Sequence, residues 1–408
     1  MNICCVIFDD MELAGKESCT GCGACAYVCP KKCISFKKDE TYYDIAYPVI
    51  DERQCINCGK CQKFCPALNP LERATPISAY AAWSSDSEER RTSASGGVAA
   101  EIYKYALKEG WSIVGASFDE NFKVCLELTD DLDVINKFKN SKYVFSYTGN
   151  IFHDIAYKLK NGKKIVVVAL PCQIAAIRKI FNDNLDNLLL VDLVCHGTMP
   201  YEYLKQYIGY MEKLYNKKIM RLSFRDPAKG TENFALSLFD EENICFYSST
   251  SLTDPYQYAY HRMVAYRENC YHCRYANCNR VSDITLSDYK GLGSCSPCNF
   301  SEKKVSSILI NTVKGRKCID WLIDNGTIVV EKRPVEEPIK GDSQLRSPSD
   351  KSFVRRLWEK YYNGNFISDT IFIYRLSVSM KYFLLIYSLP KRIFRKIFKI
   401  LWSKSCCK

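Results

Sequence analysis

Residues 19–30 read CTGCGACAYVCP, and residues 55–66 repeat the pattern as CINCGKCQKFCP. Each stretch carries four cysteines at the spacing C-x2-C-x2-C-x3-C, followed by a proline. Small residues at Gly21, Gly23, Ala24 and Gly59 allow backbone N–H groups to approach whatever the sulfur atoms hold. Long apolar runs are scarce here, so we expect much of this unit's core to come from something other than side chains.

This spacing is typical of bacterial ferredoxins, in which three cysteines bind one 4Fe-4S cluster and the fourth binds the cluster of the other half. Zinc is the alternative, but paired C-x2-C zinc knuckles do not predict the third and fourth cysteines or the proline in both halves. Cys33 is an additional cysteine, to which we assign no ligand role. The predicted ligands are Cys19, Cys22, Cys25 and Cys65 for the first cluster, and Cys55, Cys58, Cys61 and Cys29 for the second.

The chain has 408 residues and 23 cysteines, enough length for two or three domains and many more thiols than usual. Its first residues, MNICCVIFDD, contain no basic segment and only a short apolar run. We therefore expect no secretory signal peptide and a cytoplasmic location. In a reducing compartment, clustered cysteines indicate metal rather than disulfides.

The net charge of +11 is concentrated at the C-terminal end. Residues 371–408 hold nine basic and no acidic residues, which leaves +2 for the rest of the chain. A nearly neutral body gives no reason to expect a nucleic-acid partner. In the tail, one helical face opposite the basic residues would carry Ile393, Phe394, Ile397, Phe398 and Leu401.

This tail pattern predicts peripheral contact with the inner membrane surface. A core helix with a basic solvated side is the alternative. A membrane-spanning helix is less compatible with the sequence, because Arg375 and Lys381 interrupt the apolar run.

Behind the cysteine repeat, strands and helices alternate. We expect strands at 111–118, 163–170 and 187–195, and helices at 96–110, 151–162 and 173–181. This pattern predicts an α/β fold with a mixed, largely parallel sheet. Shorter, irregular strands indicate an antiparallel insertion at 220–285, and the polar stretch 84–95 is interpreted as linker and loop.

The predicted organisation has three parts. A dicluster ferredoxin (α+β) domain covers 1–75, an α/β domain covers 76–345, and a basic amphipathic segment covers 346–408.

Four further cysteines stand where this fold would bring separate segments together. Cys172 and Cys195 follow two buried strands, and the ends of parallel strands in α/β sheets are where cofactors bind. Cys270 and Cys273 form a C-x2-C pair on a loop. The four can hold a third 4Fe-4S cluster, or Cys172 and Cys195 can be ordinary buried residues. Spacing does not exclude competing ligands at Cys278, Cys295 and Cys298.

The stretch TSASGGV at 92–98 precedes an expected helix. Ser93, Ser95, Gly96 and Gly97 supply hydroxyls and backbone N–H groups at a positive helix end, which suits a phosphate. An ordinary helix cap with glycines is the alternative.

Several motifs together resemble the family of coenzyme F-420-reducing hydrogenase and dehydrogenase beta subunits. Besides the dicluster run, they are TSASGGV, NSKYVFSYTG, LPCQIAAIRK, DLVCHGTMP, SFRDPAKG, CYHC and VSDITLSDYKGLG, in this order between Cys19 and Gly293. The resemblance implies an FAD-containing iron–sulfur flavoprotein. It also implies that Cys172, Cys195, Cys270 and Cys273 are cluster ligands.

The resemblance further places the SASGG stretch at the FAD phosphate or ribityl region, with Lys142 and Asp288 near the flavin. Ser287 and Lys290 replace the glycine and the tryptophan that are frequent in the family's last motif, which puts the use of coenzyme F-420 itself in doubt. Similar members resemble components of bacterial surface-polysaccharide biosynthesis loci.

These features predict an oxidoreductase in which 4Fe-4S clusters and FAD connect a low-potential donor, such as ferredoxin or flavodoxin, to a small-molecule or glycan-precursor substrate. His196 is a candidate to relay a proton to the flavin, although a capping or hydrogen-bonding role is favoured. A non-catalytic electron-transfer subunit that feeds a partner enzyme is the first alternative. A cluster-bearing structural or sensor protein is the second.

Overall fold

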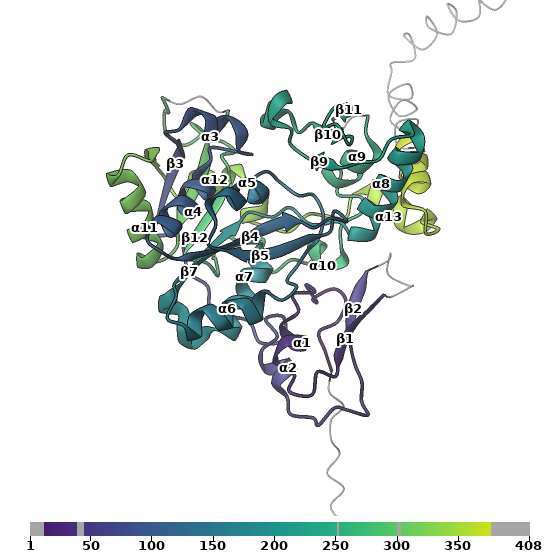
Figure 1. Ribbon diagram of the computed structural model, residues 1–408, viewed down its shortest axis with the longest axis horizontal. Coiled ribbons are helices and arrows are strands. Elements are labelled where there is room, and N and C mark those ends of the chain that lie inside the picture. Colours follow the sequence, from purple (N-terminus) through teal and green to yellow (C-terminus); the bar gives the residue numbers. More distant parts are fainter. Residues whose placement is uncertain (1–11, 39–44, 251–252, 300–302, 377–408) are drawn as a thin grey trace, which may run out of the picture.

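The structure is a computed structural model that describes residues 12–38, 45–250, 253–299 and 303–376. A small N-terminal unit lies against a larger α/β body (Figure 1). The unit contains two short helices and an antiparallel strand pair with Ile34 opposite Ile50. The bounds are α1 (Ala24–Val28), β1 (Ile34–Lys38), β2 (Ala46–Ile50) and α2 (Lys60–Lys63).

The cysteine duplication is visible in the backbone of the N-terminal unit. Each short helix follows a glycine in the left-handed conformation, Gly23 with φ +79° and Gly59 with φ +71°. Each helix carries the third cysteine of its half, Cys25 or Cys61, at its second position. The buried side chains of the unit form two small groups that contain cysteines, Cys19 with Ile45 and Tyr47, and Cys33 with Ile34 and Cys61.

The body is built on a nine-stranded mixed sheet in the order β14-β3-β13-β12-β8-β7-β4-β5-β6. The neighbours β12-β8, β8-β7, β7-β4 and β5-β6 are parallel, and the other four pairs are antiparallel. The predicted mixed α/β sheet is therefore confirmed, with its parallel part concentrated at the centre. The strands are β3 (Ser78–Ser84), β4 (Ser112–Phe118), β5 (Val124–Thr129), β6 (Ser146–Tyr147), β7 (Ile165–Ala169), β8 (Leu188–Leu193), β12 (Ile284–Asp288), β13 (Ser306–Ile310) and β14 (Ile328–Arg333).

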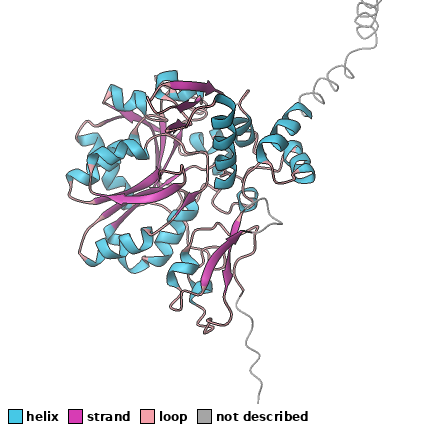
Figure 2. Ribbon diagram, turned by 45° about the vertical axis from the view of Figure 1, so that its right-hand side comes forward, coloured by secondary structure: helices cyan, strands magenta, loops and turns pink. Residues whose placement is uncertain are grey.

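Helices cover both faces of this sheet (Figure 2). Val166 and Val168 of β7 pack on the face covered by α4 (Val98–Lys108) and α11 (Val313–Asp324). Ile165 and Val167 pack on the opposite face, under α6 (Ile151–Lys160) and α7 (Pro171–Ile180). A strand buried on both faces must be apolar at every position, which explains the run IVVVA.

The predicted antiparallel insertion is present as a separate three-stranded sheet in the order β11-β10-β9. Tyr203, Tyr207, Phe224 and Tyr256 form its aromatic core with Trp358 from near the C-terminal end. The strands are β9 (Arg221–Ser223), β10 (Leu236–Phe239) and β11 (Cys245–Ser249). The nearby helices are α8 (Tyr201–Tyr215), α9 (Pro255–His261), α10 (Glu268–Tyr271) and α13 (Phe353–Tyr361), and the remaining short helices are α3 (Ser87–Thr92), α5 (Ile135–Phe138) and α12 (Glu336–Gly341).

The interpretation of residues 84–95 as linker and loop is wrong. Helix α3 occupies half of this stretch, and Asp86 caps it by accepting hydrogen bonds from the N–H groups of Glu88 and Glu89. Glu89 is buried and forms ion pairs with Lys104 and Lys139. Glu89 and Ser93 are buried and pair within the body, whereas residues 85–88 and Arg91 face water. A polar composition therefore does not distinguish this short helix from a linker.

The structure also places the first part of the predicted segment 346–408 in the core. Trp358, Phe366 and Ile373 are fully buried against the aromatic cluster of α8 and α9. The predicted membrane-contact helix lies outside the described residues. Within the described ranges, no helix is both long and apolar enough to cross a membrane.

Replacing Phe366 with alanine should lower the free energy of unfolding by about 3–5 kcal/mol, the usual cost of emptying a buried phenylalanine site. Its ring stacks on Tyr203 with centroids 4.6 Å apart. Phe372, which is 51% exposed, provides the matched control, and its alanine variant should stay within about 0.5 kcal/mol of wild type. Urea unfolding followed by circular dichroism measures both. Equal stability of the two variants would contradict the placement of this segment in the core.

Candidate iron–sulfur and flavin site

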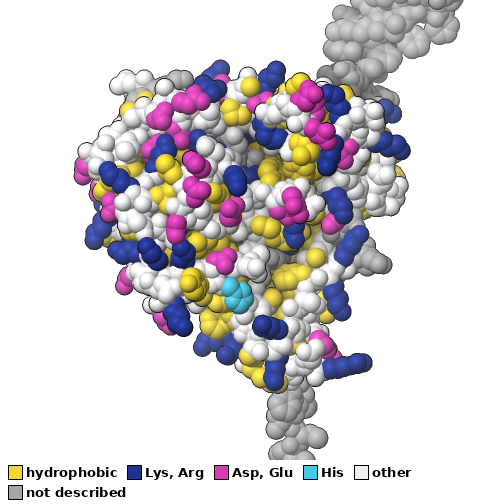
Figure 3. Space-filling model, viewed as in Figure 1, with side chains coloured by type: hydrophobic (Ala, Val, Ile, Leu, Met, Phe, Trp, Pro, Cys, Tyr) yellow, Lys and Arg dark blue, Asp and Glu magenta, His cyan; other side chains and the backbone are white. Residues whose placement is uncertain are grey.

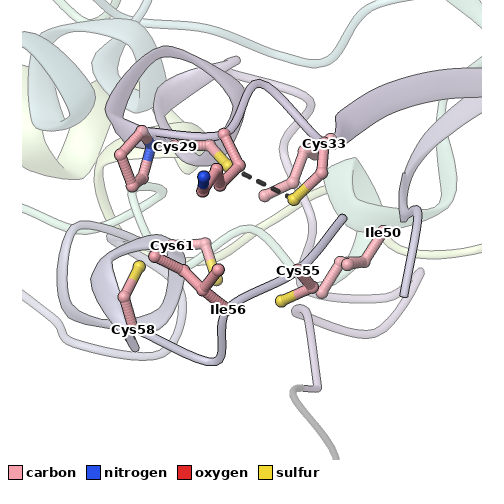
Figure 4. A pocket seen from close by; sticks show the side chains of 10 residues that line it. Cys29, Cys33, Ile50, Cys55, Ile56, Cys58 and Cys61 are labelled. Atoms are coloured by element: carbon pink, nitrogen blue, oxygen red, sulfur yellow. Dashed lines mark hydrogen bonds between the residues drawn. The ribbon is translucent and has the colours of Figure 1, made fainter. Parts of the chain in front are cut away.

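A pocket in the N-terminal unit is lined by the thiols predicted to hold the second cluster (Figure 4). Cys29, Cys55, Cys58 and Cys61 all line it, together with Ile34 and Ile50. Thiolate ligands with an apolar surround are what a 4Fe-4S cluster requires, so the residues present fit that group.

Cys33 lines the same pocket and is the thiol that the spacing argument missed. Its Sγ lies 3.4 Å from the Sγ of Cys29. A tight turn produces this contact, with Lys32 in the left-handed region and its N–H donating to the carbonyl of Cys29. The sequence signal was the second cysteine of CPKKC, four residues after Cys29.

The two touching thiols have different environments. Burial and the nearby Cys29 raise the pKa of Cys33 to about 11. Burial also acts on Cys29, but the backbone N–H groups of Cys33, Lys31 and Lys32 outweigh it and lower its pKa. The fold thus favours the thiolate at Cys29, the predicted ligand.

The four thiols predicted for the first cluster also lie together. Cys19, Cys22, Cys25 and Cys65 are close enough that every pair interacts electrostatically. Burial raises the pKa of Cys22 to about 11, and the neighbouring thiols add to this. Without a metal, burial and crowding thus disfavour the thiolates, and bound iron would compensate their negative charge.

The third set of thiols comes from three separate segments of the body. Cys172 is the second residue of α7, Cys195 follows β8, and Cys270 and Cys273 lie in and after α10. All four interact electrostatically with one another, and burial raises the pKa of each. The structure therefore brings together the four cysteines predicted for a third cluster.

The competing cysteines have other neighbours. Cys278 Sγ lies beside the side chain of Asn279, Cys295 is exposed beside Glu337, and Cys298 packs near Tyr289.

The first and third sets of thiols are neighbours. Cys22 contributes to the electrostatic environment of Cys172, and Tyr275 lies close to both. The turn between β6 and α6 contacts the N-terminal unit here, because Thr148 Oγ1 donates to the carbonyl of Cys22 at 3.2 Å.

A buried ion pair lies close to the third set of thiols. Arg280 donates to Asp192 at 2.8 Å, and both side chains are almost fully buried. Arg280 also lowers the pKa of Cys195 and Cys273, against the stronger effect of burial. The sequence alone gave no sign of this pair, since the two residues are 88 positions apart.

The residues predicted at the FAD phosphate have structural roles of their own. Ser93 Oγ donates to Glu89 at 2.9 Å, and Ser95 Oγ donates to the carbonyl of Val305 at 3.0 Å. Gly96 is packed so closely on β3 that an added Cβ would lie 2.4 Å from the carbonyl oxygen of Ala82. Gly97 caps α4 with φ +89° and no side-chain cap.

Cationic side chains gather beside these residues. Arg225 donates to Asp288 at 3.0 Å, at the end of β12, and also to the carbonyl of Thr231. Lys304 donates to the carbonyl of Ser93, and burial lowers its pKa to about 8. The structure thus connects two predicted parts of the flavin site, Asp288 and residues 93–97, through Arg225, Thr231 and Lys304. The sequence had not identified these three connecting residues.

Lys142 lies on a neighbouring segment. Its ammonium donates to the carbonyls of Lys139 at 3.1 Å and Phe138 at 3.4 Å. Burial lowers the pKa of Lys142 to about 7. Lys139 of the same segment donates to Thr92, so this segment contacts the residues before α4. We refer to Arg225, Lys304, Lys142 and residues 92–97 together as the rim.

His196 follows Cys195 and forms a triad with two charged side chains, those of Lys290 and Asp342. Lys290 donates to His196 Nε2 at 2.7 Å and lies 3.2 Å from Asp342, which in turn is 3.6 Å from His196 Nε2. Burial would raise the pKa of Asp342, but His196 and Lys290 lower it to about 2. The predicted hydrogen-bonding role of His196 agrees with this geometry, and Lys290 is a partner that only the structure identified.

Parts of the chain match known protein families. Residues 162–336 match the family described as coenzyme F420 hydrogenase/dehydrogenase, C terminus of the beta subunit. These residues belong to that family. Residues 18–69 and 47–106 match 4Fe-4S dicluster domains. The chain is thus an iron–sulfur protein of the oxidoreductase electron-transfer type.

Relatives of the chain include a subunit of the F(420)H(2) dehydrogenase of Methanosarcina mazei, 24% identical over 79% of this chain and 87% of the relative. A coenzyme F420-dependent sulfite reductase from Methanocaldococcus jannaschii is 29% identical over 41% of this chain and only 26% of the reductase. A chain of the F420-reducing [NiFe] hydrogenase complex from Methanosarcina barkeri has a TM-score of 0.45 at 18% identity and covers 76% of this chain and 94% of that chain.

The contact between Cys29 and Cys33 predicts that the two thiols can replace each other. Replacing Cys29 with serine should leave the iron content of the protein unchanged, because Cys33 already lies in the same pocket. The double variant Cys29→Ser/Cys33→Ser should lose about four iron atoms. Iron analysis of anaerobically purified protein measures this, with Cys61→Ser as a comparison at a corner of the same pocket. Loss of iron from the single Cys29→Ser variant would show that Cys33 cannot substitute.

Proposed function

We propose that the chain is an FAD-containing iron–sulfur oxidoreductase, in which three 4Fe-4S clusters exchange electrons with a flavin that acts on a small molecule or glycan precursor. The observation that carries the proposal is the convergence of Cys172, Cys195, Cys270 and Cys273 beside the first set of thiols. Twelve thiols in three adjacent sets form a route from the N-terminal unit into the body.

Iron–sulfur clusters carry single electrons, and a bound flavin would supply the conversion between one- and two-electron chemistry. The chain's own residues provide the surroundings for such a cofactor at the end of β12. Arg225, Lys304 and Lys142 supply positive charge for the FAD phosphates, together with the backbone before α4. The carboxyl ends of β8 and β12 place this rim next to Cys195.

The triad of His196, Lys290 and Asp342 is accessible from solvent, since His196 and Lys290 are both about two-fifths exposed. We propose that it orients a substrate or moves a proton at His196 Nε2. Low-potential donors such as ferredoxin or flavodoxin suit the exposed N-terminal unit.

A second candidate function is that of an electron-transfer subunit that feeds a separate catalytic partner. The relative from Methanosarcina mazei carries the name of a dehydrogenase subunit, and its similarity covers 79% of this chain. Basic and acidic side chains alternate over the body in Figure 3. Turnover of a small substrate by the isolated chain would distinguish the enzyme from the subunit.

The three-cluster proposal predicts about twelve iron atoms per chain. Replacing Cys270 with serine should remove about four of them and stop flavin reduction by the N-terminal clusters. Cys278→Ser is the matched control and should remove none, because Cys278 lies beside Asn279 rather than the third set. Iron and sulfide analysis with flavin absorbance measures both. A wild-type content of eight iron atoms with full flavin would rule out the third cluster.

The flavin proposal predicts that Lys142→Met weakens FAD binding by about 10- to 100-fold, the usual loss for a hydrogen bond to a charged group. The ammonium is charged below its pKa of about 7, so wild-type FAD affinity should fall as the pH rises through that value. Fluorescence titration of deflavinated protein measures both effects, and iron content should not change. Lys137→Met, at an exposed position of α5, is the control. Equal FAD affinity in the two variants would contradict a role for Lys142.

A further inference from the structure

Arg267 is a buried cation between the first and third sets of thiols. It is 4% exposed and precedes α10, the helix that carries Cys270. In the described part of the chain, no carboxylate lies within ion-pair distance of its guanidinium, and its Nη2 has no hydrogen-bond partner. A buried charge without compensation is costly, so this arginine requires an explanation.

The guanidinium is aimed at the loop of the first set. Gly21 lies between Cys19 and Cys22, and a Cβ added there would be 2.9 Å from Arg267 Nη2. The absence of a side chain at Gly21 thus lets the guanidinium approach the backbone of this loop. The ring of Phe145 supports the guanidinium from one side, with the guanidinium carbon 4.2 Å from the ring centroid.

Arg267 is also bonded to the segments that carry the third set of thiols. The backbone N–H of Arg267 donates to the carbonyl of Thr198, three residues after Cys195, at 2.9 Å. Its Nε faces the amide oxygen of Asn269 at 3.4 Å. The hydroxyl of Thr198 in turn lies 3.8 Å from the Sγ of Cys270. One cation therefore lies against the loop of the first set while its backbone is bonded to the segment of the third.

We propose that Arg267 is a positioning residue that bridges the first and third 4Fe-4S clusters and raises the reduction potentials of both. This proposal rests on the proposed function for the third cluster, but its effect on the first cluster does not. Four thiolates give each cluster a net negative charge, and reduction by one electron adds another. A fixed positive charge favours the reduced form, and the free Nη2 can donate to a sulfur atom of the first cluster.

An arginine suits this place better than a lysine. Its planar guanidinium presents donors in fixed directions, so one face can rest on Phe145 while Nε and Nη2 point to different partners. It also stays protonated in a buried site, where a lysine ammonium readily loses its proton. Electron transfer between the two clusters therefore takes place beside a constant charge.

The test is a redox titration of the full-length protein, reconstituted with iron and sulfide and monitored by electron paramagnetic resonance. Arg267→Met should shift the reduction equilibria of the first and third clusters at least tenfold toward the oxidised form, which for a one-electron couple is about 59 mV. The second cluster should not shift, because the Cys29 pocket is not in contact with Arg267. Arg262→Met, an exposed position in the same segment, is the matched control.

Arg267→Lys should restore part of the potential, because the charge is retained near the same place. Unchanged potentials of the first cluster in an Arg267→Met protein with full iron content would overturn the proposal, as would an equal fall in all three clusters. Arg267→Gln replaces the methionine variant if the latter loses iron. If wild-type protein holds only eight iron atoms, there is no third cluster. The reduction potential of the first cluster in the Arg267→Met variant then decides alone whether Arg267 has the proposed role.

Discussion

The contact between α1 and the body is the interaction on which the rest of the arrangement depends. Ala24 is fully buried against Phe152 and Ile155 of α6, and the ring of Tyr27 lies 5.2 Å from that of Phe152. The side-chain core of the N-terminal unit is small, so the unit needs its contact with the body to orient its cysteines toward the third set. Docking on α6 and α7 sets the first group of thiols beside the third. The proposed electron route therefore follows from ordinary apolar packing as much as from cluster chemistry.

Buried charge is the second constraint. The proposed clusters would place negative charge in a part of the protein with little access to water, where it must be compensated. Arg267 lies between the first and the third proposed clusters. Arg280 lies beside the third, and its charge is neutralised by Asp192. Further along, Arg225 and Lys304 meet Asp288 and Ser93 at the proposed flavin. Positive side chains thus lie beside the first and third proposed clusters and the proposed flavin, while the body as a whole stays nearly neutral.

The sequence predicted well what depends on local spacing. Hydrophobic periodicity and glycine stops predicted the buried strands β7 and β8 and the helices α4, α6 and α7. The cysteine spacing predicted the duplicated N-terminal unit. The positions of Cys172 and Cys195 directly after parallel strands predicted that they lie near each other. The sequence could not predict contacts made by the fold. Cys33 returns to Cys29 through a turn with a left-handed lysine. Arg280, which precedes β12, meets Asp192 of β8, and α3 forms from residues that were interpreted as a linker. The serines and glycines before α4 suggested a phosphate loop, yet Ser93, Ser95 and Gly96 are each explained by bonds or packing within the body.

The central claim, that three clusters and one flavin share one electron route, is tested most directly by an anaerobic reductive titration of the purified chain with dithionite, followed by absorbance. Three one-electron clusters and one two-electron flavin predict uptake of about five electrons per chain, with flavin bleaching coupled to cluster reduction. Uptake of about two electrons without flavin bleaching would contradict the account and leave a dicluster ferredoxin joined to a body without a redox role.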